Sequence, residues 1–274
     1  MNSKVLIIAG MHRSGTSVVT QWLNRCGLFI GNNLLGPGIG NEQGHFEDAD
    51  FLSLHQKFLK KRNFPDTGLI TKATGSLTEI EQMELKGMLE TKNRKHDEWG
   101  WKDPRTCLFL GEYSKLIPSA YYVIVVRNFN ATVSSLITRE FKMNEKRFLQ
   151  KRGLSKLKWQ LFKRKSLEKI FEKETDRFLK VWVHYYEEIL QHARSLPTDS
   201  VVFLNYNTLM KADADIFSTI RDQWHFAVNY FPFTNVYKKE LLSEEQDIKK
   251  YIKNKDLEAR ALAIEEYMMQ HYAL

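Results

Sequence analysis

Residues 4–17, KVLIIAGMHRSGTS, decide the fold of this 274-residue chain. The first six are apolar after the opening lysine and rich in branched side chains, which predicts a strand buried on both faces. The next eight hold two glycines and three hydroxyl side chains and form a turn. Residues 18–26 are expected to form a helix that Gly27 closes. A strand, a glycine-containing turn and a helix in this order are typical of a parallel α/β sheet.

Two further apolar strands are expected at residues 121–126 (YYVIVV) and 201–204 (VVFL), with a shorter one at 99–102. Strands this apolar, separated by helices, predict an α/β fold, a P-loop-like parallel β-sheet flanked by helices on both faces. We find no internal repeat or low-complexity linker, so residues 1–274 are expected to form a single domain. Helices are expected over residues 51–61, 77–94 and 130–139, and through the basic segment that follows.

The positive charge of the chain is concentrated in one segment. The formal net charge is +8, and residues 142–180 hold 14 basic and 5 acidic residues, so they carry the whole excess. Apolar residues recur there at helical intervals, which predicts a basic helical insertion over residues 142–192. Two interpretations stay open: a solvated amphipathic helix pair, or an electropositive rim for an anionic ligand.

The composition excludes several classes of protein. Hydrophobic residues make up 43% and charged residues 27%, which argues against disorder. The two cysteines, Cys26 and Cys107, lie in apolar stretches and exclude a disulfide framework or a cysteine-rich zinc site. The apolar run at residues 5–9 is too short for a signal peptide, and no run approaches a membrane span. A cytoplasmic protein without a transmembrane segment is therefore expected.

The turn after the first strand has the chemistry of an anion cradle. Gly15 lets the backbone approach a ligand closely, while Ser14, Thr16 and Ser17 supply hydroxyl groups. The following helix adds backbone N–H groups and the positive end of its dipole. Arg13 adds a full charge that can grip an anion with two parallel hydrogen bonds. These features together favour a phosphate or a sulfate.

The nucleotide P-loop, G-x-x-x-x-G-K-[ST], fits this turn only in part. Gly10, Gly15 and Ser17 have the right spacing, but Thr16 replaces the lysine that reaches the outer phosphates of ATP. The strand at 121–126 ends in Arg127, where a nucleotide-hydrolysing enzyme needs an acidic residue to help hold Mg²⁺. The turn is therefore a phosphate cradle that does not suit a metal–triphosphate.

At these residues the chain resembles the sulfotransferases that use 3′-phosphoadenosine-5′-phosphosulfate (PAPS), in particular bacterial-type enzymes related to carbohydrate and small-molecule sulfotransferases. Residues 13–17, RSGTS, match the 5′-phosphosulfate loop of that family, and Arg127 with Ser135 has the spacing of its 3′-phosphate site. Tyr206, just past a late strand, resembles a tyrosine that borders the adenine. The donor-binding residues that the resemblance implies are Arg13, Ser14, Gly15, Thr16, Ser17, Arg127, Ser135 and Tyr206.

The resemblance implies transfer of a sulfuryl group from PAPS to a hydroxyl or amine, which leaves 3′,5′-bisphosphoadenosine (PAP). Such a transfer needs in-line positioning, a base for the acceptor proton, and cations beside the oxygens that gain charge. No metal is expected, because Arg13 and a lysine can supply that charge. Lys102, at the end of the strand at 99–102, is the lysine that could reach the sulfuryl oxygens. The neighbouring Asp103 and Arg105 either pair with each other or contact the acceptor.

The candidates for the base lie in residues 41–50, NEQGHFEDAD, between a glycine-rich loop and a helix. The resemblance favours Glu47 first, His45 second and Glu42 third. Asp48 is a further candidate in this stretch, and a carboxylate here, Glu47 included, can instead cap the helix that follows. His12, next to Arg13, is interpreted as a loop residue and not as a base.

One departure from the family concerns the cover of the 3′-phosphate. The small-molecule enzymes carry a glycine-rich stretch near the C-terminus, whereas residues 232–274 contain no glycine. The basic helices are expected to replace it, with Lys163, Arg164 and Lys165 as the residues to test. The expected partner is a small-molecule or carbohydrate acceptor, and no nucleic acid. The alternative functions are a P-loop small-molecule phosphotransferase (a kinase) and a non-enzymatic polyanion-binding protein.

Overall fold

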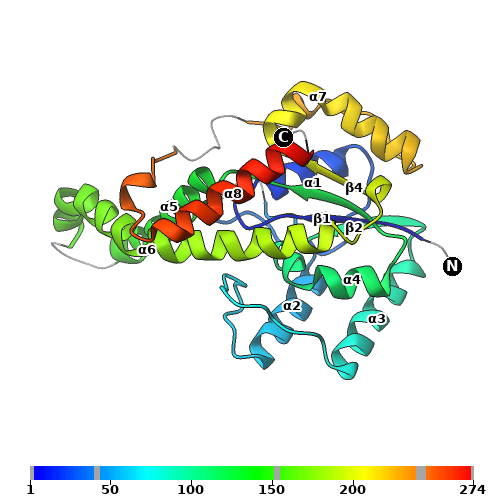
Figure 1. Ribbon diagram of the computed structural model, residues 1–274, viewed down its shortest axis with the longest axis horizontal. Helices are drawn as coiled ribbons and strands as arrows, with labels where there is room; N and C mark the ends of the chain where they lie inside the picture. The colour runs from blue at the N-terminus through cyan, green and yellow to red at the C-terminus, as the bar shows by residue number, and fades with distance from the viewer. Residues whose placement is uncertain (1–2, 40–43, 151–154, 239–244, 273–274) are drawn as a thin grey trace.

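A sheet of parallel strands forms the centre of the protein (Figure 1). The computed structural model describes residues 3–39, 44–150, 155–238 and 245–272. The strand order in this part of the chain is β2-β1-β3-β4, and every neighbouring pair is parallel. The carboxyl ends of the strands therefore meet at one edge. The strands are β1 (Lys4–Ala9), β2 (Glu98–Lys102), β3 (Tyr121–Val125) and β4 (Val201–Leu204).

Alternate residues of each strand enter two different cores. Val5 and Ile7 of β1 face the larger core, and Leu6 and Ile8 face the smaller one. The larger core lies under α2 (Ala49–Lys61), α3 (Glu79–Asn93), α4 (Leu110–Leu116), α5 (Phe129–Leu149), α6 (Ser155–Ala193) and α8 (Lys255–Tyr272). The smaller core lies under α1 (Thr16–Arg25) and α7 (Tyr206–Ser218). The predicted parallel sheet with helices on both faces is confirmed.

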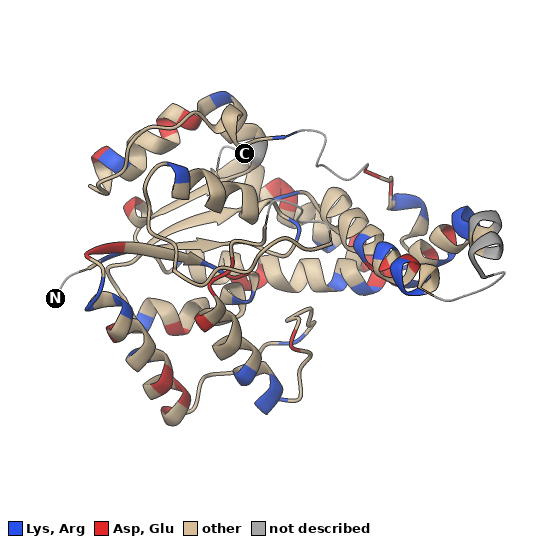
Figure 2. Cartoon of the chain, turned by 180° about the vertical axis from the view of Figure 1, so that it is seen from behind, with Lys and Arg blue, Asp and Glu red and all other residues tan. Residues whose placement is uncertain are grey.

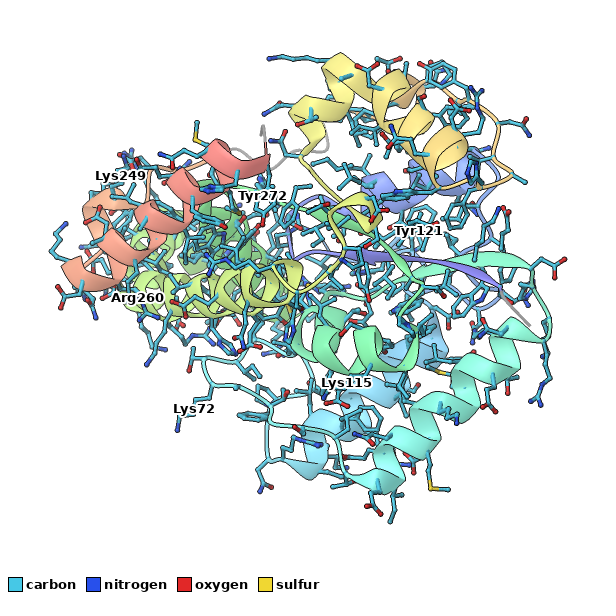
Figure 3. The ribbon with its side chains drawn as sticks, turned by 45° about the vertical axis from the view of Figure 1, so that its right-hand side comes forward. Lys72, Lys115, Tyr121, Lys249, Arg260 and Tyr272 are labelled. Atoms are coloured by element: carbon cyan, nitrogen blue, oxygen red, sulfur yellow. The ribbon has the colours of Figure 1, made fainter. Side chains whose placement is uncertain are left out.

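Aromatic rings fix the helices to the sheet. Tyr272, at the end of α8, stacks on Phe203 of β4 with ring centroids 3.7 Å apart (Figure 3). On the other face, Tyr121 of β3 stacks on Trp224 at 4.9 Å. Rings of this size dominate the apolar area that a core buries. They hold the helical layers against the sheet, whose edge carries the candidate site.

The basic segment has two halves with different environments. In its second half, Trp182, Tyr185 and Ile189 of α6 are fully buried in the larger core. The end of α5 and the first half of α6 extend away from the sheet and carry many of the charged side chains (Figure 2). There Lys163 pairs with Glu145 at 2.7 Å. The helix expected over residues 130–139 continues to Leu149, so α5 carries part of the basic segment.

Arg62 ties down the loop between α2 and α3. Its guanidinium donates to both carboxylate oxygens of Glu81, at 2.8 and 2.7 Å, and to the carbonyls of Thr74 and Ser76, each at 3.0 Å. Glu81 also forms a capping box with Thr78 at the start of α3. This loop matters for function because it lines part of the cavity described below.

Glu81→Gln is expected to lower the free energy of unfolding by about 2 kcal/mol at pH 7, because it breaks a buried, charged hydrogen-bond pair. The hydrogen bonds from Arg62 lower the pKa of Glu81 to about 2 from an ordinary 4.5. The stabilisation is present above pH 4.5 and is lost as the pH falls towards 2. Denaturant titrations at pH 7 and near pH 2 should therefore show the deficit of the variant shrinking on acidification. The exposed Glu90→Gln on the same helix is the control, and an equal deficit at both pH values would contradict the assignment.

Candidate active site

The turn after β1 packs directly against the end of β3. A Cβ on Gly10 would lie 2.5 Å from the carbonyl oxygen of Val125, so only glycine fits there. The backbone N–H of Gly10 donates to Cys107 Sγ at 3.1 Å. Ser14 donates its hydroxyl to the carbonyl of Met11 at 2.7 Å and closes the turn from inside.

The helix that follows the turn presents its N-terminus without a local anion. Gly15, with a φ of 100°, is the N-cap of α1. Among the described residues, no N-cap side chain accepts a hydrogen bond from the first N–H groups of the helix. The first turn of α1 carries no acidic residue, and Thr16 and Ser17 open it. The backbone N–H groups and the dipole of the helix are therefore available to a ligand. The structure thus brings together the groups from which an anion cradle was predicted, and the cradle stays a prediction.

Two sequence blocks that lie more than a hundred residues apart meet at this edge. Arg13 donates from Nε to Ser135 Oγ at 2.9 Å, and Arg127 donates from Nη1 to the carbonyl of Arg13 at 3.1 Å. Burial, together with the charges of Arg139 and Arg127, lowers the pKa of Arg13 to about 10. Neighbouring guanidinium groups repel one another, and an anion placed between them would reduce that repulsion.

Glu47 lies at the centre of a second cluster, next to the cradle. Lys102 Nζ is 3.0 Å from Glu47 Oε1 and 3.4 Å from Ser17 Oγ, and its side chain is 1% exposed. Arg105 Nη1 lies 3.7 Å from Glu47 Oε2, and His45 Nδ1 lies 3.8 Å from Oε1. Burial lowers the pKa of Lys102, while the charge of Glu47 opposes that shift. One carboxylate thus lies among three nitrogen-bearing side chains beside the anion cradle.

A buried chain of polar groups supports this cluster from behind. Arg105 Nη1 is 3.0 Å from Asp103 Oδ1. Of the two alternatives for these residues, the structure therefore shows that they pair with each other. His55 Nδ1 lies 3.5 Å from Asp103 Oδ2, and its Nε2 lies 2.7 Å from the hydroxyl of Tyr113. Asp103, His55 and Tyr113 are fully buried. This chain fixes the orientation of Arg105 and, through it, of Glu47.

The helix cap near the predicted base belongs to Asp48. Its Oδ1 accepts the backbone N–H of Asp50 at 2.9 Å, and its Oδ2 pairs with Lys92 at 2.8 Å. Glu47 makes no cap and faces the cavity instead. Glu42 lies outside the described residues. Tyr206 is the first residue of α7, and the structure does not describe its side chain.

A cavity of about 840 Å³ opens over both clusters. Its size is suited to a nucleotide together with a second substrate. Its lining includes Arg13, Lys102, Glu47 and Arg127. The loop between α2 and α3, which Arg62 holds by hydrogen bonds, forms another wall. The basic segment contributes Lys142, Arg147 and Arg177, whereas Lys163, Arg164 and Lys165 are exposed and do not line it.

The sequence interpretation missed two residues of the cavity. His12 is 9% exposed, and its Nε2 lies 2.9 Å from the carbonyl of Thr67, so that nitrogen carries the hydrogen. Burial lowers its pKa well below 6.5, so the ring is neutral at pH 7. Arg139 lies four residues after Ser135, and this helical spacing was the signal that would have placed it beside the cradle.

The part of the chain that the structure describes holds neither a membrane-spanning helix nor a cluster of metal-binding side chains. No helix there is long and apolar enough to cross a bilayer. No group of three or more His, Cys, Asp and Glu side chains there could hold a metal ion.

Comparison with known proteins gives one family and a consistent fold. A family model described as "Sulfotransferase family" matches residues 6–227. The sulfotransferase domain from the olefin synthase of Synechococcus PCC 7002 superposes with a TM-score of 0.51 at 16% identity, covering 97% of this chain and 95% of that one. The sulfotransferase domain from the curacin biosynthetic pathway has a TM-score of 0.50 at 14% identity and covers 97% of both chains. No curated protein sequence matches this chain.

Proposed function

Because this chain belongs to the sulfotransferase family, we propose that it transfers a sulfuryl group from PAPS to a hydroxyl or amine and releases PAP. The observation that carries the proposal is the hydrogen bond from Arg13 to Ser135. It joins the turn after β1 and the start of α5 into one cationic edge, as a donor with two separate phosphate positions requires. The expected acceptor is a small molecule or a carbohydrate.

The donor would be held by the chain's own residues, without a metal. The N–H groups at the start of α1, with Ser17 and Arg13, would bind the 5′-phosphosulfate. Arg127 and Ser135 would bind the 3′-phosphate and so distinguish PAPS from unphosphorylated adenosine. Ser14 already donates its hydroxyl within the turn, so its contribution is to hold the cradle in shape.

The transfer is proposed to proceed in line, with Glu47 as the base. A bond forms between the acceptor oxygen or nitrogen and sulfur, while the bond from sulfur to the bridging phosphate oxygen breaks and its electron pair stays on PAP. The acceptor proton passes to Glu47. His45 is the second candidate base, because burial lowers its pKa and leaves it neutral at pH 7.

Lys102 connects the two halves of this mechanism. It lies between Ser17 of the cradle and Glu47, within 3.4 Å of both. Negative sulfuryl oxygens beside Ser17 would compete with Glu47 for the ammonium group. Donor binding would thereby weaken the ion pair and make Glu47 a stronger base at the moment when the acceptor must lose its proton.

PAP is expected to raise the melting temperature of the protein in the presence of EDTA, because its binding needs no metal. At a concentration of 100 times Kd the stabilisation amounts to about 2.7 kcal/mol. A thermal-shift titration checks this, with adenosine 5′-monophosphate as the control that lacks the 3′-phosphate. Stabilisation by Mg-ATP but not by PAP would instead favour the phosphotransferase.

The same assay separates the enzyme from a general polyanion binder. A non-enzymatic binder would hold heparin or nucleic acid with a steep dependence on salt, and Arg13→Ala would leave that binding unchanged. The proposed enzyme binds PAP through Arg13, so the two functions predict opposite responses to the same substitution.

A further inference from the structure

Arg139 is a cation that lines the cavity, and the described residues provide no hydrogen bond to its Nε. It lies on α5 one helical turn after Ser135, so both side chains leave the helix on the same face. Its Nε is buried without a hydrogen-bond partner among the described residues. In contrast, Lys102 and Arg105 both lie within 4 Å of a carboxylate oxygen of Glu47.

The charges around Arg139 place it near the reacting end of the cavity. Burial lowers its pKa, Glu47 opposes this shift and Arg105 adds to it. The charge of Arg139 in turn lowers the pKa of His45 and of His12. A guanidinium whose buried Nε makes no hydrogen bond is costly, and an anionic ligand that accepts a hydrogen bond from it would lower that cost.

The proposed donor contacts leave this cation unassigned, although its charge also acts on Arg13. In the proposed function Arg13 and Arg127 hold the donor's phosphates, and Lys102 meets the sulfuryl group. From Arg139 the row of cavity-lining cations continues along α5 to Lys142 and Arg147, away from Ser135. Eight residues of helix span about 12 Å. The row therefore extends from the base outward, over the part of the cavity left to the acceptor.

The only acidic residue of α5 that lines this stretch is already neutralised. Glu140 Oε2 lies 3.0 Å from Arg177 Nη2, so within the described residues it does not offset the row. Met143 lies between the cations on the same stretch of helix and gives an apolar surface to the body of a ligand. A cationic row with an apolar strip suits a molecule that carries both a carbon skeleton and negative charge.

We infer that the acceptor is itself an anion: a hydroxyl compound whose carboxylate, phosphate or sulfate group binds Arg139 while its hydroxyl faces Glu47. The inference rests on the proposed sulfuryl transfer and adds the chemical class of the acceptor. It also explains why a protein with a cationic donor site keeps further cations beside its base, where they would otherwise only repel one another.

The test uses protein saturated with PAP, so that the donor cations are occupied. Matched acceptors that differ in one charged group are titrated at constant ionic strength by calorimetry: glucose against glucuronate and glucose 6-phosphate, and 4-hydroxybenzyl alcohol against 4-hydroxybenzoate. At least one anionic compound is expected to bind about tenfold or more tightly than its neutral counterpart. Arg139→Gln should remove that preference and change PAP affinity less than about threefold, and Arg139→Lys should restore part of it.

The control variant is Lys165→Gln, which removes one charge from an exposed position of the basic segment outside the cavity. It should leave the preference intact. Equal binding of the charged and neutral compounds, no binding of any compound at about 10 mM, or loss of PAP affinity in Arg139→Gln would each overturn the inference. Failure of wild-type protein to bind PAP would instead overturn the proposed function, and that titration precedes the others.

Discussion

Arg13→Ala is expected to weaken PAP binding by about a hundredfold or more. The substitution removes the charge that the cradle offers to the 5′-phosphate and also the hydrogen bond to Ser135 at 2.9 Å. Loss of one partner from a buried, hydrogen-bonded charge pair costs about 2–5 kcal/mol, and about 3 kcal/mol already corresponds to a factor of 150. Calorimetric titration of PAP in EDTA measures the effect directly.

The stability of the ligand-free protein should change little in this variant. Arg13 is charged in a site where burial and two neighbouring arginines disfavour its charge, so its removal relieves repulsion. The φ of 69° strains arginine and alanine alike because both carry a Cβ, so it adds no difference between the two proteins. Arg25→Ala, at an exposed position on α1, is the matched control and should bind PAP normally. Wild-type PAP affinity in Arg13→Ala would remove the basis of the donor assignment.

Glu47→Gln is expected to reduce turnover by about a hundred- to ten-thousandfold while PAP still binds. The amide cannot take up the acceptor proton, and the donor phosphates do not depend on Glu47. The variant should also be less stable by about 3–5 kcal/mol, because Lys102 loses its buried carboxylate partner, while Arg105 keeps Asp103. Transfer of labelled sulfuryl from PAPS to the best acceptor, measured with PAP affinity, separates the two effects.

Asp48→Asn is the control for the loss of stability. It removes a neighbouring buried carboxylate that caps α2 and pairs with Lys92, but this residue does not line the cavity. Its turnover should stay near that of the wild type. Glu47→Asp, with its carboxylate on a shorter arm, should retain part of the activity. If Glu47→Gln turns over normally, His45 becomes the base, and His45→Gln should then be inactive.

The fold was predictable because its signals are local. The strand at residues 4–9, the capping box at Thr78 and the glycine-containing turn each follow from a few neighbouring residues. Parallel pairing then places the ends of β1 and β3 side by side, so Arg13 and Arg127 could be assigned to one edge from the order of the elements.

The rest of the site depends on contacts between residues far apart in the sequence, which local sequence patterns do not predict. The contact between Lys102 and Glu47 crosses 55 residues and needs the loop before α2 to fold over the end of β2. Arg139 lies at the end of the helix expected over residues 130–139, but no local pattern shows that this face of the helix lines the cavity. His12 lies in the turn after β1, as expected, but its burial comes from the distant segment that contains Thr67 and could not be predicted.

The thiol of Cys107, which contacts the turn after β1, offers a way to measure opening of this turn without any substrate. Cys107 accepts the N–H of Gly10, and burial raises its pKa to about 12, so at neutral pH it is an inert thiol. Alkylating reagents react with an accessible thiolate, whereas Cys107 in the folded protein is a buried, protonated thiol. The rate at which Cys107 is alkylated would therefore report how often the floor of the donor site opens, and a bound nucleotide would slow it by keeping that floor closed.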